Sequence, residues 1–494
     1  MLWPTELLRR VPRRVGRRRR ASSRTLRYPE THVGPTGTGG REVGDQVRIP
    51  EHGVPREQVL EEVRAAADGD ADWHGGRTFS LVYHHSDAHH AFLEKVVGAY
   101  LSTNALNPIS FQSLRRFEAE VVAMSAGLLG GDATAAPKDR VVGTMSSGGT
   151  ESILLAVKTY RDRARAAGVT APNLVLPVTA HPAFLKAGHL LDVEVRKVPF
   201  AHDFRVDLAA VASRIDEGTI AVVGSAPSYP HGVVDPIEEL AALATERGIG
   251  CHVDACLGGF LLPWTERLGH PVPPFDFRVP GVTSMSADLH KFGFTAKGAS
   301  VVLYRGLDLR RHQFQVETGW PGGIWLSPTI AGTRPGGAIA GAWATLQAFG
   351  EDGYLELHGQ LQATGEQLRA GIEGIDGLAV LGDPASSAVF AFGSTSDEVD
   401  VYAVADALEA RGWHPDRLLA PAALHVMVTP VHVGDVAERF LADLAAAVED
   451  VRGRPELSGQ GQAAMYGMVA QLPEGQTEVA DDFVLQLIDG LYEV

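Results

Sequence analysis

A histidine and a lysine stand side by side at the end of the segment Ser286-Ala287-Asp288-Leu289-His290-Lys291, which leads into Phe292-Gly293-Phe294-Thr295-Ala296-Lys297-Gly298. A lysine amine held in a protein can form a covalent bond with an aldehyde, and a substrate amine can later displace it. The pair alone is weak evidence, because lysine is common and most lysines are solvated. Whether Lys291 has this function must be judged from the motifs in the rest of the chain.

Short apolar runs alternate with helical stretches on both sides of this segment. The runs cover residues 140–145, 173–178, 194–198, 220–224, 250–253, 282–285 and 300–304. Brief strands that alternate with helices are typical of an α/β domain built on a mostly parallel sheet. The pattern therefore predicts an α/β fold with a mostly parallel seven-stranded sheet.

A glycine-rich turn follows the first of these runs. It contains Ser146-Ser147-Gly148-Gly149-Thr150 and leads into a helical stretch at 153–161. Glycines let backbone N–H groups approach an anion, and a helix N-terminus favours negative charge. The turn lacks the Gly-Lys-Ser/Thr ending of a Walker loop. Taken alone, it is better explained as an ordinary capped helix.

Two further residues lie where predicted strands end, at the edge where open α/β sheets bind ligands. Asp254 ends the run Cys251-His252-Val253-Asp254, and a buried carboxylate there needs a cationic partner or several donors. A protonated pyridine nitrogen is such a partner. His181 follows the run at 173–178, and an imidazole there can stack on a pyridine face. A lone histidine is more often structural, and a strand-end Asp often caps a turn.

The four features occur in the order anion loop, ring-stacking histidine, strand-end Asp and His-Lys pair. Together they predict an enzyme that uses pyridoxal 5′-phosphate (PLP), with the aspartate-aminotransferase-like fold (fold type I). We expect a disordered Arg-rich tail over 1–50 and an N-terminal helical segment over 51–130. A large PLP-binding domain is expected over 131–350, and a smaller C-terminal α+β domain over 351–494.

Composition narrows the class of protein further. The 494 residues carry a net charge of −16, which argues against a nucleic-acid surface on the folded body. No segment approaches 18 uninterrupted apolar residues, so we expect no transmembrane segment. The two cysteines have neither disulfide nor zinc spacing, which fits a reducing cytoplasm. The histidines around His84 and His90 are interpreted as a polar helix start, and no metal site is predicted.

Several longer motifs support a specific resemblance. They are residues 148–154, 226–236, 252–260, 322–337 and 464–468, together with the His-Lys segment. From about residue 76 onward the chain resembles the sphingosine-1-phosphate lyases, within the PLP-dependent group II decarboxylases. The resemblance implies a bacterial-type soluble relative that acts as a homodimer with shared active sites. The implied reaction is a retro-aldol cleavage of a phosphorylated long-chain 2-amino-3-hydroxy base to a fatty aldehyde and ethanolamine phosphate.

The resemblance also implies roles for particular residues. Lys291 would carry the cofactor, Asp254 would pair with its pyridine nitrogen, and His181 would stack on its ring. The residues that would hold the cofactor phosphate are Gly149, Thr150 and His290.

On the substrate side, the resemblance implies that Lys297, six residues after Lys291, and Tyr83 face the substrate phosphate. Both are also candidate catalytic residues. Thr333 and Asn107 are further candidate substrate-binding residues. Thr333 stands where the family usually has serine, and its hydroxyl is preserved. Asn107 is a departure, because the family has an active-site histidine there, and an amide cannot titrate near neutral pH. This difference leaves the substrate and its chain length open.

Two other functions stay open at this stage. Amino-acid decarboxylation uses the same fold and cofactor, and Lys297 and Tyr83 argue against it. A cofactor-binding protein without catalysis is the second, although such a protein would have little use for Lys291, Asp254 and the glycine turn together.

Overall fold

The computed structural model describes residues 48–107, 109–470, 484–486 and 488–490. Residues 71–491 form one compact unit, which contains every site discussed below. Helix α1 (Arg56–Ala67) belongs to a second unit, and none of its residues is buried. Most of the predicted Arg-rich tail, residues 1–47, lies outside the described residues.

A seven-stranded sheet confirms the predicted α/β fold, and each predicted run corresponds to one strand. The strands are β1 (Val141–Ser146), β2 (Asn173–Pro177), β3 (Glu194–Val198), β4 (Thr219–Ser225), β5 (Gly250–Asp254), β6 (Ser284–Ala287) and β7 (Ser300–Arg305). Their order is β1-β7-β6-β5-β4-β2-β3. The pairs from β3 to β6 are parallel, and β7 is antiparallel to both of its neighbours.

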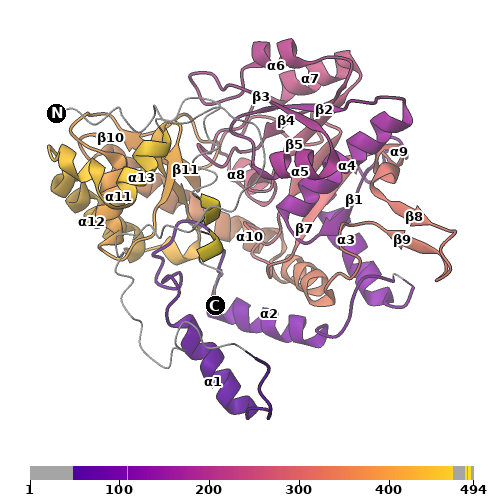
Figure 1. Cartoon of the computed structure of the whole chain (residues 1–494), viewed down its shortest axis with the longest axis horizontal. Helices are drawn as coiled ribbons and strands as arrows, with labels where there is room; N and C mark the ends of the chain where they lie inside the picture. Colours follow the sequence, from indigo (N-terminus) through magenta and orange to yellow (C-terminus); the bar gives the residue numbers. More distant parts are fainter. Residues whose placement is uncertain (1–47, 108, 471–483, 487, 491–494) are drawn as a thin grey trace, which may run out of the picture. The chain divides into compact units, whose positions relative to one another are not determined.

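Both faces of this sheet are buried, which explains why its strands are continuous apolar runs in the sequence. In β4, Val222 belongs to one hydrophobic cluster and Val223 to another. Successive side chains of a strand point to opposite faces, so the two clusters lie on the two sides. Helices α4 (Gly149–Ala166) and α5 (Ala183–Leu191) cover the side of Val223, and α7 (Ile237–Arg247) contributes to the other (Figure 1).

Shorter elements complete the connections around the sheet. They are α6 (Leu208–Arg214), η2 (Gly258–Phe260), α8 (Leu262–Arg267), α9 (Leu307–Arg310) and η3 (Arg311–Gln313). A small hairpin of β8 (Gln315–Glu317) and β9 (Trp325–Ser327) follows them.

Long helices flank the sheet at its β1 side. Within the predicted helical segment over 51–130, α3 (Gln112–Leu128) contacts β1, and α2 (Asp87–Ala99) precedes it. Both pack against α10 (Gly336–Glu373). The regular helix of α10 is interrupted at Gly350, where φ is 60°, a value that glycine adopts without steric cost.

The C-terminal part is a smaller α+β arrangement, as predicted. Its antiparallel sheet has the order β10-β11-β13-β12, formed by β10 (Leu378–Val380), β11 (Val389–Ser394), β12 (Asp416–Leu419) and β13 (Ala422–Met427). Its helices are α11 (Val401–Glu409), η4 (Pro430–His432), α12 (Asp435–Val451), η5 (Pro455–Gly459) and α13 (Gly461–Ala470). The domain boundaries given above stay predictions.

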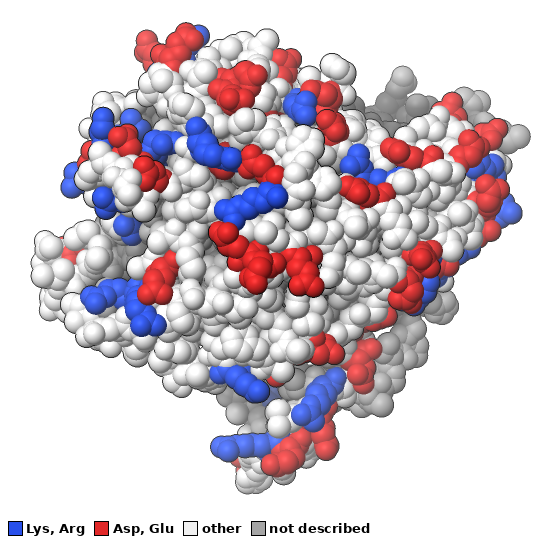
Figure 2. All heavy atoms as spheres, turned by 180° about the vertical axis from the view of Figure 1, so that it is seen from behind, with Lys and Arg blue, Asp and Glu red and all other residues white. Residues whose placement is uncertain are grey.

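The surface agrees with the charge argument. On the face shown in Figure 2, Lys and Arg side chains alternate with Asp and Glu, and the described residues form no continuous basic patch there. Within the described part of the chain, no helix has the length and apolar character needed to cross a membrane.

Candidate active site

The glycine-rich turn joins β1 to the N-terminus of α4. A Cβ at Gly149 would lie 2.7 Å from Sγ of Cys256 and 2.8 Å from Oδ2 of Asp288. Both distances are too short for a real side chain, so only glycine fits at this position. The first turn of a helix has free N–H groups and the positive end of the helix dipole. The turn can therefore bind an anion such as a phosphate.

Lys291 lies beside a buried carboxylate. Its Nζ is 3.0 Å from Oδ2 of Asp288, and the Asp288 side chain is only 2% exposed. Burial alone would lower the pKa of Lys291, but the nearby acidic groups, with Asp288 first among them, together outweigh it, and the pKa is raised. Burial likewise would raise the pKa of Asp288, but the cation of Lys291 holds that pKa below its ordinary value. The pair is therefore charged in this state.

The tautomer of His290 follows from its hydrogen bonds. The backbone N–H of Ala299 donates to Nδ1 of His290 over 3.1 Å. Burial lowers the pKa of His290, so its ring is neutral and its one proton is on Nε2. That atom is 3.7 Å from Oδ2 of Asp288, and His290 lines the same cavity as the glycine turn. His290 thus presents an N–H donor next to the helix N-terminus.

Asp254 is held at the end of β5 by two donors. The backbone N–H of Cys256 and the hydroxyl of Ser286 each donate to its Oδ1 over 3.1 Å. These bonds fix the carboxylate, which is almost fully buried. The arrangement fits the predicted pairing with a protonated ring nitrogen. Nδ1 of the exposed His181 accepts from the N–H of Ala183 over 3.1 Å, which fixes its ring just before α5.

Two neighbouring cavities meet at Lys291. The glycine-turn cavity, of ≈ 380 Å³, is lined by residues 147–151, Ile153, His181, Cys256, Asp288, His290 and Lys291. The tyrosine cavity, of ≈ 320 Å³, is lined by Ser80, Leu81, Tyr83, His181, Ser225, Pro227, Tyr229, Asp254, Cys256, Leu257, Lys291, Lys297, Asp416 and Met427. They share His181, Cys256 and Lys291. The anion-binding turn and the strand-end Asp254 therefore lie on either side of one lysine.

Lys297 and Tyr83 form a pair on the wall of the tyrosine cavity. Nζ of Lys297 donates to the carbonyl of Leu81 over 2.8 Å and lies 4.9 Å from the centre of the Tyr83 ring. Leu81 has φ of 68°, unusual for a residue with a side chain, and this strained backbone presents its carbonyl to the lysine. The Tyr83 hydroxyl donates to Sδ of Met427 over 3.2 Å.

The two groups of this pair differ in charge. Burial, reinforced by the nearby cation of Lys291, lowers the pKa of Lys297 to about 8. Burial raises the pKa of Tyr83 above its ordinary value, so its phenol keeps its proton. Lys297 is therefore a cation at neutral pH that loses its charge in mildly alkaline solution, and Tyr83 is a neutral donor.

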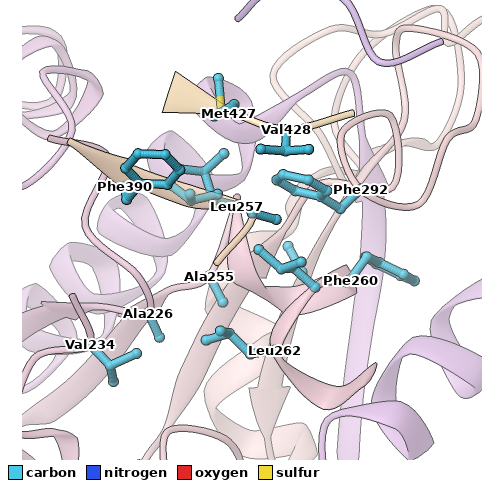
Figure 3. Close-up of a cluster of buried hydrophobic side chains, with 14 of the residues drawn as sticks. Ala226, Val234, Ala255, Leu257, Phe260, Leu262, Phe292, Phe390, Met427 and Val428 are labelled. Atoms are coloured by element: carbon cyan, nitrogen blue, oxygen red, sulfur yellow. The ribbon is translucent and has the colours of Figure 1, made fainter. Parts of the chain in front are cut away.

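Hydrophobic packing fixes the backbone around these groups. Phe292, which follows Lys291, is fully buried. Figure 3 shows it with Leu257 and Phe260 from the segment after β5, next to Phe390 and Met427 of the C-terminal sheet. Residues next to the large sheet and residues of the C-terminal sheet thus form one hydrophobic cluster, which includes the residue that follows Lys291.

The histidine-rich stretch has two parts. Ser86 caps α2, and Nε2 of the buried His89 donates to the carbonyl of Phe294 over 3.0 Å, which supports the segment after Lys291. His74, His84 and Asp87 place one potential ligand atom each within 4.8 Å of one another. His74 and Asp87 are exposed, and the absence of a metal site stays a prediction.

Two predicted site residues lie outside the cavities that contain Lys291. Asn107 is exposed, and its Oδ1 accepts from the N–H of Ile109 over 2.9 Å and from that of Ser110 over 3.3 Å. It lines a separate cavity of ≈ 900 Å³ with Leu106 and Ile324. In this chain the amide oxygen of Asn107 therefore stabilises its own turn.

Thr333 is also exposed, in a segment that is tied to the chain on both sides. The backbone N–H of Ile330 donates to Oε1 of Glu151 over 2.9 Å. On the other side, Nη1 and Nη2 of Arg334 donate to the two carboxylate oxygens of Glu118 over 2.6 and 2.9 Å. These contacts fix the segment on both sides of Thr333, although Thr333 itself lines neither of the cavities that contain Lys291.

Three residues of the site were not found from the sequence. Asp288 lies three residues before Lys291, and this spacing was the one indication in the sequence that the two side chains meet. Tyr229 and Asp416 line the tyrosine cavity. Tyr229 lies in the motif at 226–236 but was assigned no role, and Asp416 belongs to none of the motifs. Asp416 comes from the C-terminal sheet, and only the packing of that sheet brings it to Lys291.

The fold and the cavities can now be compared with known proteins. The model of the pyridoxal-dependent decarboxylase conserved domain matches residues 41–389, well over half of the chain. The chain belongs to this family.

Its relatives narrow the assignment within the family. A sphingosine-1-phosphate lyase of Oryza sativa subsp. japonica is 44% identical over 420 residues, covering 84% of this chain and 77% of the relative. Sphingosine-1-phosphate lyase 1 of Rattus norvegicus is 41% identical over 422 residues, covering 85% and 73%. The solved sphingosine-1-phosphate lyase of Burkholderia pseudomallei is 42% identical, with a TM-score of 0.79 over 87% of this chain and 97% of that one. The resemblance inferred from the motifs is therefore confirmed.

More distant structures confirm the fold alone. A glutamate decarboxylase of Lactobacillus brevis is 20% identical, with a TM-score of 0.72 over 82% of this chain and 95% of that one. The family confirms that the cofactor is PLP. The residues fit this cofactor, because the glycine turn offers an anion site, Asp254 offers a fixed carboxylate, and Lys291 lies between them.

Proposed function

We propose that this protein cleaves the C2–C3 bond of sphingosine 1-phosphate, or of a similar phosphorylated long-chain 2-amino-3-hydroxy base. The products are a fatty aldehyde and ethanolamine phosphate. The chain is a PLP-dependent lyase by family, and the proposed substrate is the one named in its relatives. The bound cofactor supplies an electron sink for the bond that breaks.

The observation that carries the proposal is the second cation of the tyrosine cavity. Lys297 and Lys291 line the same cavity, and Lys297 is held on its wall by the Leu81 carbonyl and the Tyr83 ring. An ammonium group is a suitable point-charge partner for a phosphate. We propose that Lys297 and the protonated phenol of Tyr83 bind the phosphate of the substrate.

The cofactor roles proposed for the other residues follow from the contacts above. Gly149 and Thr150 offer backbone donors to the cofactor phosphate, and His290 offers its Nε2 proton. Asp254, held by Ser286, pairs with the ring nitrogen and keeps it protonated.

The remaining roles concern the ring face and the covalent link. His181 stacks on the face of the ring. Lys291, the lysine shared by both cavities, holds the cofactor and is the better placed of the two lysines for proton transfer at the reacting bond.

The tyrosine cavity also argues against amino-acid decarboxylation. An amino acid brings a carboxylate, which in proteins is commonly bound by arginine. Among the described residues that line this cavity, Lys291 and Lys297 are the cations, and Asp416 adds a negative charge. A phosphorylated amino alcohol fits these charges better, because it has one anionic group for Lys297 and no carboxylate to place.

We also propose that the active unit is a homodimer with shared sites. Five exposed apolar residues, named here the loop face, line the ≈ 900 Å³ cavity together with Asn107: Leu106, Ile109, Ile324, Trp325 and Leu326. A grouped apolar surface of this kind supports association with another protein surface. In a twofold dimer the loop face, Asn107 and Thr333 would belong to the site of the neighbouring subunit.

The test is to incubate the PLP-loaded protein with sphingosine 1-phosphate and to measure ethanolamine phosphate and fatty aldehyde. We expect both products in equal amounts. Release of carbon dioxide from amino acids, measured in parallel, examines the alternative reaction. Carbon dioxide release without ethanolamine phosphate would overturn the lyase assignment, and binding of PLP without either product would favour a non-catalytic protein.

A further inference from the structure

Asp416 is a carboxylate of the tyrosine cavity that the proposed reaction has not used. It begins β12, is paired with His425 of β13 and lines the cavity together with Lys291 and Tyr83. The wall of the cavity thus contains an acid from the C-terminal sheet. Its charge raises the pKa of both Tyr83 and Tyr229, after the larger effect of burial, so both phenols lie within its electrostatic reach.

One oxygen of this carboxylate lacks a partner. Oδ2 of Asp416 is buried and has no hydrogen bond to any of the described residues. Buried polar atoms are nearly always hydrogen-bonded in folded proteins, so an exception in a cavity indicates an absent ligand. The adjacent Arg417 forms its ion pairs with other residues: its Nη1 is 2.7 Å from Glu409, and its Nη2 is 2.5 Å from Asp406.

Burial raises the pKa of Asp416, and the hydroxyl of Ser80 and the charge of Arg417 oppose the rise. The side chain is therefore a strong hydrogen-bond acceptor when ionised, in a site where water is partly excluded. A neutral O–H or N–H donor from a ligand would supply the missing partner at little electrostatic cost.

The proposed substrate offers one such donor. Its phosphate is an anion, which Asp416 repels and Lys297 attracts. Its amine would bind to the cofactor in place of Lys291. Its alkyl chain has no donor. The hydroxyl group on C3, the carbon next to the amine-bearing carbon, is the polar group that is left.

We propose that Asp416 accepts a hydrogen bond from the 3-hydroxyl group of the substrate and so selects 2-amino-3-hydroxy compounds in the tyrosine cavity. This inference rests on the proposed function and assigns a substrate-specificity residue on the C-terminal domain. It explains why the cavity tolerates an unpaired buried oxygen. It also predicts that amino acids are disfavoured, because a free carboxylate in this position would lie against a second carboxylate.

The test compares two ligands that differ by one hydroxyl group. Sphinganine 1-phosphate is the substrate, and 3-deoxysphinganine 1-phosphate is an analogue without the hydroxyl. The proteins are the PLP-loaded wild type, Asp416→Ala and the isosteric Asp416→Asn. The control is Asp435→Asn, which removes an 81%-exposed carboxylate of the same domain. Bound-cofactor absorbance and thermal unfolding confirm that each variant is folded and loaded.

For Asp416→Ala we expect kcat/KM for sphinganine 1-phosphate to fall by about 10- to 100-fold, the range of a hydrogen bond to a charged group. The inhibition constant of the 3-deoxy analogue should stay within about twofold of wild type, because this compound makes no such bond. Asp416→Asn, which keeps an acceptor oxygen, should lose less. Asp435→Asn should leave both ligands unchanged.

Equal weakening of both ligands, or of neither, would overturn the inference. A failure of this inference can be distinguished from a failure of the proposed function. If the wild type releases no ethanolamine phosphate, the proposed reaction fails, and the same two ligands are compared by dissociation constants from the change in cofactor absorbance. A wild type that binds both compounds equally then contradicts the role of Asp416, and a preference for the hydroxyl compound that disappears in Asp416→Ala supports it.

Discussion

The lysine cavities and the loop face differ in how complete they are within one chain. Around Lys291 the charges are matched: Asp288 lies 3.0 Å from the lysine, and Asp254 has two donors. The loop face instead leaves Ile109 77% and Ile324 82% exposed. Within one chain the first region already brings together the groups that we propose hold the cofactor, whereas the second has the character of a surface that is completed by another subunit.

The largest expected effect concerns the cavities that contain Lys291. Lys291→Ala should reduce the formation of ethanolamine phosphate by at least about 10⁴-fold, comparable to the loss of a catalytic nucleophile in other enzymes. The visible absorbance of the lysine-bound cofactor should disappear as well. Lys95→Ala removes an exposed lysine of α2 and should retain full activity. Full steady-state turnover by Lys291→Ala would contradict the assignment of this lysine.

The next prediction connects the two regions. Thr333→Glu places a negative charge in the segment that the proposed sharing assigns to the site of the neighbouring subunit, and we expect activity to fall by about 100-fold through repulsion of the cofactor phosphate there. If sites are shared, a mixed dimer of Lys291→Ala and Thr333→Glu chains has one intact site. Co-refolded or co-expressed chains should then recover roughly a quarter of wild-type activity.

The control for this experiment is Thr395→Glu, an exposed threonine of the C-terminal domain, which should be active by itself. Recovery measured against the dimer fraction by sedimentation distinguishes shared sites from separate ones. No recovery in a mixture that forms heterodimers would show that each chain completes its own site.

Lys297 gives a prediction of intermediate size with a defined pH dependence. Its pKa is lowered to about 8, so the cation that attracts phosphate is present below pH 8 and is lost as the pH rises through that value. We expect kcat/KM to fall above about pH 8, because this quantity reports the free enzyme. Bound phosphate stabilises the cation, so the corresponding fall in kcat should occur at higher pH.

The matching variant is Lys297→Met, which keeps the length of the side chain and removes the charge. Its kcat/KM should be about 10- to 100-fold lower near pH 7, and the fall above pH 8 should be absent. Lys186→Met, on exposed α5 surface, serves as the control. An unchanged alkaline limb in Lys297→Met would assign that limb to another group.

The same comparison shows what the sequence could predict. Gly149, His181, Asp254 and Lys291 each follow a predicted strand, and parallel strands end at one edge of a sheet, so their meeting was predictable from order alone. All four line the two cavities. Asp416 was not predictable in this way, because it joins the site through the packing of Phe390 and Met427 against the segment after Lys291, shown in Figure 3.

The side-chain hydrogen bonds that hold the loops near the site were also not predicted from the sequence. The resemblance implied that Asn107 replaces an active-site histidine, but the structure shows its oxygen bonded to Ile109 and Ser110 of its own turn. An Asn two or three residues before a free N–H commonly forms this bond. Likewise, the partly buried pair of Glu118 and Arg334 positions the segment of Thr333, and no motif indicates that the two residues meet.

The smallest expected effect is at Asn107 itself. Asn107→His restores the residue type of the family, but it removes the two hydrogen bonds of the turn, so we expect the free energy of unfolding to fall by about 1 kcal/mol. Because the amide oxygen of Asn107 is bound within its own turn, we expect it to make no contact that the reaction needs, and activity at pH 7 should change by less than about threefold. Asn107→Asp retains the turn bonds and is the matched control for stability. A gain of tenfold or more in Asn107→His, following the titration of a histidine near pH 6.5, would instead show that this position takes part in proton transfer, and that the loop face reaches a reacting centre in the assembled enzyme.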